Sequence, residues 1–170
     1  VGFMMVAENT NLIIEDYIME KSEDVKRLSS RYTNELITGT NALISYGIIS
    51  HKKAGNADIF ERGNTMNGGK ERFIYIGNRM KSVAFRDRYN NGYDLSFYSN
   101  GHISSYVEYR RGNVDGVLLK YFTNGQIQCF MELRNNKIEG RAIRWEEDGS
   151  IKERVIFKEP IEFIMHKGTN

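Results

Sequence analysis

The chain has 170 residues, of which 40% are hydrophobic and 27% are charged, so its composition is that of neither a disordered protein nor a membrane-embedded one. Its 24 basic and 22 acidic residues leave a net charge of +2, which is too small to predict a nucleic-acid partner. A single cysteine, Cys129, excludes an intramolecular disulfide framework and a cysteine-only metal site. We therefore expect one domain of ordinary size, or a small domain with an appendage.

The first seven residues, VGFMMVA, are similar to the end of a signal-peptide apolar region, with Ala7 at the cleavage point. No basic stretch precedes them, and they are also compatible with the packed start of the following segment. We therefore favour a cytoplasmic protein and keep an exported or periplasmic one as the alternative. No other stretch approaches the roughly 18 apolar residues that are needed to span a bilayer.

Residues 1–41 form the predicted N-terminal helical segment. Ser22, followed by acidic residues, is a candidate N-cap for a second helix, so one bent helix and two short helices are both compatible with this segment. The next stretch, ALISYGIIS at residues 42–50, is typical of a buried strand. Between residues 11 and 38, apolar side chains recur at the spacings of an amphipathic helix: Ile14, Ile18, Val25, Leu28, Tyr32 and Leu36.

The rest of the chain follows a repeat of 24 residues. The repeat is strong over residues 68–160, degenerate over residues 42–67, and followed by a C-terminal tail at residues 161–170. Apolar residues occupy matched positions in successive repeats, for example Leu95, Leu119 and Ile143. Two sets of glycines keep the same period, and Asn or Asp precedes each member of the second set: Gly92, Gly116 and Gly140; Gly101, Gly125 and Gly149.

Each repeat has the composition of a β-hairpin. One proline and 16 glycines are typical of a chain of strands that reverses direction often. Apolar and polar residues alternate with a period of two, so we expect one buried face to carry Ile127, Cys129, Met131 and Leu133. The sequence therefore predicts a mainly β protein, an elongated antiparallel β-meander of repeated 24-residue hairpins preceded by an α-helical segment.

The Asn-Gly pair at residues 124–125 is predicted to close one of these hairpins. A two-residue loop would scatter the apolar residues over both faces, whereas the three-residue loop 123–125 keeps them on one face. We expect a type I turn in which Gly125 adopts a left-handed conformation and forms a G1 bulge. The corresponding register predicts these cross-strand pairs: Tyr121–Ile127, Leu119–Cys129 and Val117–Met131, with Phe97–Ile103 and Trp145–Ile151 in the neighbouring repeats.

Three segments carry the pattern of a known repeat family: DGVLLKYFTNGQIQCFMEL, EGRAIRWEEDGSIKERVIF and, with Asn91-Gly92 in place of the acidic-Gly pair, GYDLSFYSNGHISSYVEY. This pattern resembles the bacterial variant of the MORN repeat, the family that includes YwqK-like antitoxin components. The resemblance covers residues 68–158 well, residues 42–67 weakly, and the helical segment not at all. It implies a non-enzymatic protein that in some relatives is the immunity partner of a toxin.

No catalytic or metal-binding constellation is recognisable in the sequence. The three histidines, His51, His102 and His166, lack metal-ligand spacing, and no phosphate-binding glycine loop is present. Cys129 takes an inward position beside Leu119 and is interpreted as a small core residue. We therefore expect no enzymatic activity, no metal site and no cofactor.

Aromatic residues opposite the apolar stripe are the best functional candidates. A sheet with one solvated face should be polar there. We favour burial of these aromatics by the helical segment, whose apolar stripe needs a surface; the alternative is an exposed patch that binds another chain. The candidate residues are Tyr98, Tyr106, Phe122 and Phe130, together with Arg110 from a group of basic residues in the first half of the array.

Two classes of partner follow from these residues. We favour another protein, which the resemblance extends to a toxin, and we expect no nucleic acid. The alternative is a membrane-associated scaffold that binds anionic lipid through a basic and aromatic face. The oligomeric state is not specified by the sequence.

Overall fold

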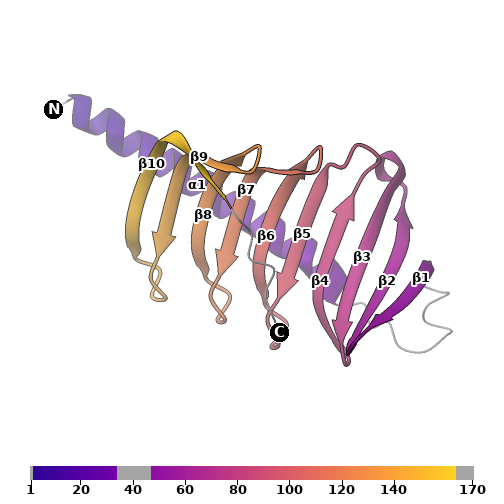
Figure 1. Ribbon diagram of the computed structural model, residues 1–170. Helices are drawn as coiled ribbons and strands as arrows, with labels where there is room; N and C mark the ends of the chain where they lie inside the picture. Colours follow the sequence, from indigo (N-terminus) through magenta and orange to yellow (C-terminus); the bar gives the residue numbers. More distant parts are fainter. Residues whose placement is uncertain (1, 34–46, 164–170) are drawn as a thin grey trace.

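The protein consists of one long helix and one antiparallel sheet, seen in a computed structural model that describes residues 2–33 and 47–163 (Figure 1). The ten strands follow one another in the sheet in chain order, which confirms the predicted β-meander. In chain order the elements are α1 Gly2–Thr33, β1 Ile48–Ala54, β2 Ala57–Asn64, the short 3-10 helix Met66–Gly68, β3 Gly69–Ile76, β4 Arg79–Arg86, β5 Gly92–Phe97, β6 Ile103–Arg110, β7 Asn113–Tyr121, β8 Ile127–Arg134, β9 Lys137–Trp145 and β10 Ile151–Glu162.

The predicted degenerate region is part of the same sheet. The hairpin β1–β2 pairs with β3 through β2. The sheet therefore includes strands from the degenerate region as well as those of the strong repeat. The buried strand expected at residues 42–50 is wrong for the part that the structure describes, because β1 is an edge strand and Ile49 is 63% exposed. Residues 42–46 of that prediction, and residues 164–170 of the predicted tail, lie outside the described residues.

The helical segment is one continuous helix that crosses one face of the sheet (Figure 1). It begins at Gly2, well before the predicted start near residue 11, and so includes the stretch that resembles a signal-peptide remnant. Ser22 lies in the middle of the helix and is buried, and it does not cap a second one. Its hydroxyl is 3.0 Å from that of Tyr121. The predicted helical residues 34–41 lie outside the described residues.

The core lies between α1 and the sheet. A single row of cross-strand neighbours runs beneath the helix over most of the sheet. A second row lies on the same side, next to the lower turns in Figure 1, those of β3–β4, β5–β6, β7–β8 and β9–β10; it consists of Tyr75, Phe97, Tyr121 and Trp145. The helix contributes Ile18, Val25 and Tyr32, which its 3.6-residue period places on one side. The central row consists of Phe60, Phe73, Val83, Leu95, Tyr106, Leu119, Phe130 and Ile143.

The three-residue turn is confirmed. The Gly125 N–H donates to the Phe122 carbonyl at 2.9 Å, and the Phe122 N–H donates to the Gln126 carbonyl at 2.8 Å. Gly125 has φ 89°, in the left-handed region, whereas Asn124 has no positive φ. The predicted pairs next to the three loops are also present: Tyr121–Ile127, Phe97–Ile103 and Trp145–Ile151.

The predicted register beyond these pairs is wrong, because each hairpin contains a second bulge. Tyr121 pairs with Ile127, and its neighbour Lys120 pairs with Cys129. The residue between Ile127 and Cys129 therefore has no partner on β7. Leu119 therefore lies opposite Phe130 and not Cys129, and Val117 lies opposite Glu132 and not Met131. A bulge of one residue moves every following side chain to the other face.

This shift has two consequences for the predicted faces. Tyr106 and Phe130, expected opposite the apolar stripe, are in register with Leu119 on the helix-covered face and are 6% and 1% exposed. Cys129, expected beside Leu119, lies on the other face opposite Lys120, although it is still buried. The favoured hypothesis of aromatic residues buried by the N-terminal helix is therefore confirmed for Tyr106 and Phe130.

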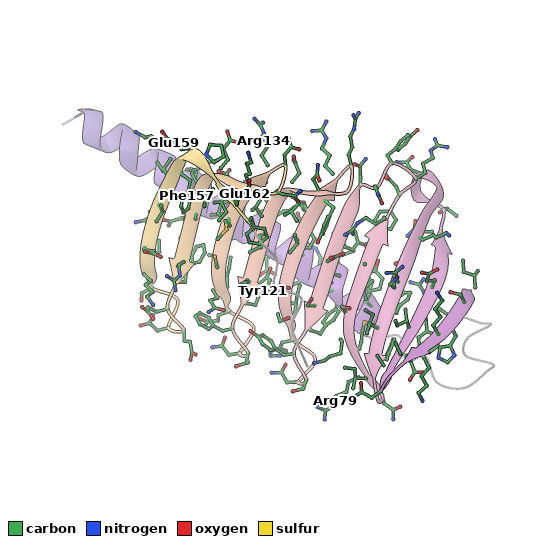
Figure 2. The ribbon with its side chains drawn as sticks, viewed as in Figure 1. Arg79, Tyr121, Arg134, Phe157, Glu159 and Glu162 are labelled. Atoms are coloured by element: carbon green, nitrogen blue, oxygen red, sulfur yellow. The ribbon has the colours of Figure 1, made fainter. Side chains whose placement is uncertain are left out.

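The face opposite α1 has a smaller core of its own. Val107, Val114, Leu118 and Leu133 form a buried cluster near the upper turns, and Phe163 packs against it. The Phe163 N–H donates to the Asn136 carbonyl at 3.0 Å, so the chain after β10 is attached to the β8–β9 turn. Charged side chains follow both rows of turns, with Arg79 at the lower ends of the strands and Arg134 at the upper ends (Figure 2).

The pairings β6–β7 and β8–β9 also shift register near their turns, between Val107 and Tyr109 and between Met131 and Leu133. A glutamate that the sequence did not predict as structural supports each shift. Glu108 Oε1 accepts from the Val117 N–H at 2.8 Å, and Glu132 Oε2 accepts from the Arg141 N–H at 2.6 Å. Each carboxylate lies against a glycine with positive φ, Gly116 or Gly140, where a Cβ would collide with it. The glutamates are 24 residues apart and each precedes its glycine by eight residues, a signal that was present in the repeat.

Phe130→Ala is expected to cost about 3–5 kcal/mol of unfolding free energy, because it leaves a cavity in the row beneath α1. The matched control is Lys120→Ala on the exposed side of the neighbouring strand, which should change stability by less than about 0.5 kcal/mol. Urea denaturation followed by circular dichroism measures both. Equal effects of the two substitutions would contradict the register described above.

Candidate functional site

The sequence-predicted binding residues do not form one patch. Tyr106 and Phe130 lie in the core beneath α1, as described above. Tyr98 and Phe122 are half-buried at the lower hairpins, where the Tyr98 hydroxyl donates to the Tyr121 carbonyl of the next repeat at 2.7 Å. Arg110 is exposed at the opposite, upper end of β6. The combined basic and aromatic face that an anionic lipid would need is therefore not assembled from these five residues.

The outer edge of β10 is the first candidate site. Among the described strands, β10 pairs only with β9, so one side of its backbone has no strand partner. It exposes Ile156 at 67% and Ile161 at 48%. Ile156 lies opposite Arg141, in a row on the helix side of the sheet. A free strand edge with an exposed aliphatic residue is the feature by which proteins accept an additional strand.

The N-terminal part of α1 extends past this edge (Figure 1). Arg154 of β10 forms an ion pair with Glu15, which marks where the helix crosses the last strand. The twelve residues from Gly2 to Ile13 continue for about 18 Å at the rise of an α-helix. Neighbouring strands lie about 4.8 Å apart, so the space beneath this oblique overhang is wide enough for about two or three further strands.

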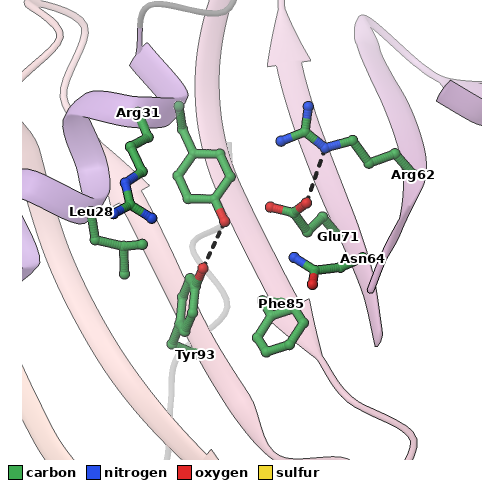
Figure 3. Close-up of a pocket in the computed structure, with 8 residues that line it drawn as sticks. Leu28, Arg31, Arg62, Asn64, Glu71, Phe85 and Tyr93 are labelled. Carbon is green, nitrogen blue, oxygen red and sulfur yellow. Dashed lines mark hydrogen bonds and ion pairs between the residues drawn. The ribbon is translucent and has the colours of Figure 1, made fainter. Parts of the chain in front are cut away.

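A pocket of about 320 Å³ at the other end of α1 is the second candidate site (Figure 3). Leu28, Arg31 and Tyr32 from the last turns of the helix form one wall, and Arg62, Asn64, Glu71, Phe85 and Tyr93 from β2–β5 form the rest. The period-two pattern Glu71, Phe73, Tyr75 placed a carboxylate among inward-facing aromatics, a signal that the sequence reasoning did not use.

The polar groups of the pocket bind one another. The Tyr32 and Tyr93 hydroxyls are 2.6 Å apart, and Arg62 Nε donates to Glu71 Oε1 at 3.0 Å. The Arg62 guanidinium also lies over the Phe73 ring, 4.8 Å from its centroid. Glu71 is only 4% exposed, and such a buried carboxylate requires the paired charge that Arg62 supplies.

Burial shifts the pKa values of the tyrosines that α1 covers. Burial, together with hydrogen bonding to the Glu71 carboxylate, raises the pKa of Tyr32 far above its ordinary value. Burial likewise raises the pKa of Tyr93, although its bond with Tyr32 opposes the shift. On β7, beneath the middle of the helix, burial raises the pKa of Tyr121 to about 12, with the hydrogen bond to the Ser22 hydroxyl opposing the shift. These hydroxyls are therefore neutral, and they are not poised for proton transfer near pH 7.

The histidines and the cysteine that the structure describes have identifiable neighbours. Within 2–33 and 47–163, no three His, Cys, Asp or Glu side chains are grouped as a metal site would require. His51 stacks on Phe60 with ring centroids 4.4 Å apart, and His102 Nδ1 lies 2.9 Å from the Thr123 carbonyl. His166 lies outside the described residues. Burial raises the pKa of the Cys129 thiol, which disfavours a nucleophilic thiolate.

Comparison with known proteins adds no assignment. No family model matches this chain, and no curated protein matches it. In the part of the chain that the structure describes, no helical segment has the length and hydropathy of a membrane span.

The protein is expected to lose stability at alkaline pH. A tyrosine whose pKa is about 12 when folded and 10.0 when unfolded binds its proton more tightly in the folded state. Its contribution to the unfolding free energy is complete below pH 10 and is lost as the pH rises towards 12. For Tyr121 this contribution is at most about 2.7 kcal/mol. Urea unfolding at pH 8, 10 and 11 measures the loss.

The control is Tyr121→Phe, in which the hydroxyl is absent and the decline between pH 10 and 11 should be shallower. A wild-type protein whose stability is constant over this interval would contradict the prediction. The same holds if tyrosinate absorbance at 295 nm showed every tyrosine ionising near pH 10 in the folded protein.

Proposed function

We propose that this protein is a non-enzymatic recognition module that binds another protein by accepting a β-strand along β10. The observation that carries this proposal is the unpaired edge of β10, with exposed Ile156 on the side where α1 extends past the sheet. The bacterial MORN-like pattern supports the same class of function, since some relatives with that pattern neutralise a toxin. A protein toxin is therefore the partner class that we propose.

An added strand would gain both backbone and side-chain contacts. The part of β10 that pairs with β9 without a register shift, residues 153–157, presents unpaired backbone groups to it, and these supply affinity in strand addition. A strand seated here would cover Ile156, and full burial of such a side chain contributes about 1.5–3 kcal/mol. It would also lie beneath the overhanging helix, so that its inward side chains continue the sandwich of helix and sheet.

The charges of β10 disfavour two of the registers in which a second copy of this chain could pair with it. A two-fold symmetric pair of β10 strands requires a register in which a residue lies opposite its own copy, so that equivalent faces stay aligned. Centred on Val155, that register places Lys152 opposite Lys158; centred on Ile156, it places Arg154 opposite Lys158. Like charges directly opposite each other are destabilising. A different protein is not bound to a symmetric register, and it can place complementary charges opposite those of β10.

The two ends of the sheet allow a matched experiment. Ile156 of β10 and Ile49 of β1 are exposed aliphatic residues on opposite edge strands, at 67% and 63%. Ile156→Lys should weaken binding of the partner by at least about tenfold, because burial of one aliphatic side chain is lost and a charge is introduced. Ile49→Lys should leave binding unchanged. Thermal unfolding verifies that both variants fold.

The measurement starts from quantitative capture out of the source cells with the wild type and both variants. A protein that wild type and Ile49→Lys retain and Ile156→Lys releases is then purified, and hydrogen exchange of the complex is recorded. Protection of the β10 amides is the expected result. Retention of every captured protein by Ile156→Lys, or protection confined to other strands, would overturn the proposal.

A further inference from the structure

We propose that the pocket between the last turns of α1 and strands β2–β5 binds a small organic anion, a carboxylate or phosphate attached to an apolar or aromatic body. This site lies at the end of the helix opposite to the β10 edge (Figures 1 and 3). It is therefore independent of the protein-binding function proposed above.

Arg31 supplies the anion-binding charge. It stands in the last turn of α1, is exposed at the rim of the pocket, and has no hydrogen-bond or ion-pair partner within the described part of the chain. Its positive charge acts on the Tyr93 hydroxyl, whose pKa it lowers against the larger effect of burial. Figure 3 shows its guanidinium on the side of the pocket where Leu28 and Tyr93 lie. A guanidinium in this position can bind a carboxylate or a phosphate by charge-assisted hydrogen bonds.

The charge of the pocket as a whole favours an anion. Arg31 and Arg62 contribute two positive charges and Glu71 one negative charge, which leaves a net charge of +1. Glu71 is buried, and its carboxylate already binds Arg62 and interacts with the Tyr32 hydroxyl. A cationic ligand would therefore meet a neutralised carboxylate and the repulsion of Arg31. An anion meets Arg31 as its charged partner.

The walls accommodate an apolar body. Phe85 and Tyr93 lie side by side with ring centroids 5.4 Å apart, and Leu28 lines the helix side. The 2.6 Å contact between the Tyr32 and Tyr93 hydroxyls holds both rings in place without a ligand. At about 320 Å³ the pocket is at the lower end of the range for small-molecule sites, which suits a ligand with a single ring.

Binding would fasten the end of α1 to the sheet. The ligand would bridge Arg31 on the helix and Tyr93 on β5, and a ligand that binds only the folded protein raises its stability by mass action. The expected signature is therefore an increase in the melting temperature with ligand concentration, together with amide chemical-shift changes around Leu28 and Tyr93.

The experiment titrates phenylacetate and phenyl phosphate into the full chain, with neutral phenylacetamide as the charge control. We expect one or both anions to bind in the millimolar range and phenylacetamide to bind at least about tenfold more weakly. The relative affinities of the two anions separate a carboxylate site from a phosphate site. Two-dimensional NMR detects binding at this affinity and locates it.

The matched variants are Arg31→Gln and Arg27→Gln, because Arg27 is an exposed arginine one turn earlier that pairs with Asp24. Arg31→Gln should weaken anion binding by about tenfold or more, and Arg27→Gln should not. Equal losses in the two variants, binding of phenylacetamide as tight as that of the anions, or no binding of either anion at about 20 mM would overturn the proposal. Ile156→Lys should leave anion binding unchanged. The anion experiment can therefore fail or succeed independently of the experiment on the strand partner.

Discussion

The packing of the apolar stripe of α1 against the central row of the sheet is the interaction on which the rest of the structure depends. A meander of hairpins has two faces, and neither can be left apolar in water without a cover. The second bulge in each hairpin turns Tyr106 and Phe130 towards the helix, where they share one apolar cluster with Ile18 and Val25. The helix therefore connects hairpins that, in the described sheet, are otherwise paired with their neighbours in sequence.

Polar contacts give this apolar packing a defined position. Successive repeats present similar rows of side chains, so an amphipathic helix held by apolar contacts alone could shift along the sheet by one repeat. Three contacts are specific to the observed position: Ser22 with Tyr121, Lys21 with Glu108 at 2.8 Å, and Tyr32 with Tyr93. A displaced helix would leave their buried members without partners, which is costly. Specificity of this kind explains polar residues on the buried side of α1.

The sequence alone predicted the structural features that recur with its 24-residue repeat. The repeated Asn-Gly and Asp-Gly pairs predicted the meander and the three-residue turns, because glycine is strongly favoured where the backbone is left-handed, as it is at Gly101, Gly125 and Gly149. The bulge after Ile127 has no such residue, since a bulge in the ordinary region of φ is accessible to any amino acid. Alternation alone therefore placed Cys129 and Phe130 on the wrong faces. The pocket was missed for a related reason, as it combines residues of α1 with four strands that are distant in sequence.

The oblique path of α1 makes the two ends of the protein different. At the β1 end the helix finishes above β3–β5, and its last turn leaves the pocket with Arg31 at its rim. At the β10 end the helix continues beyond the sheet, so the last strand has a cover above it and, among the described residues, no strand on its outer side. Edge strands commonly avoid unwanted pairing through charge, and β1 carries Lys52 and Lys53 in this way. On β10 the charged residues flank Val155, Ile156 and Phe157, an apolar centre that charge alone does not protect. The difference between the two edges follows from where the helix lies. For the same reason the proposed strand-binding site and the proposed small-ligand site lie at opposite ends of one sheet.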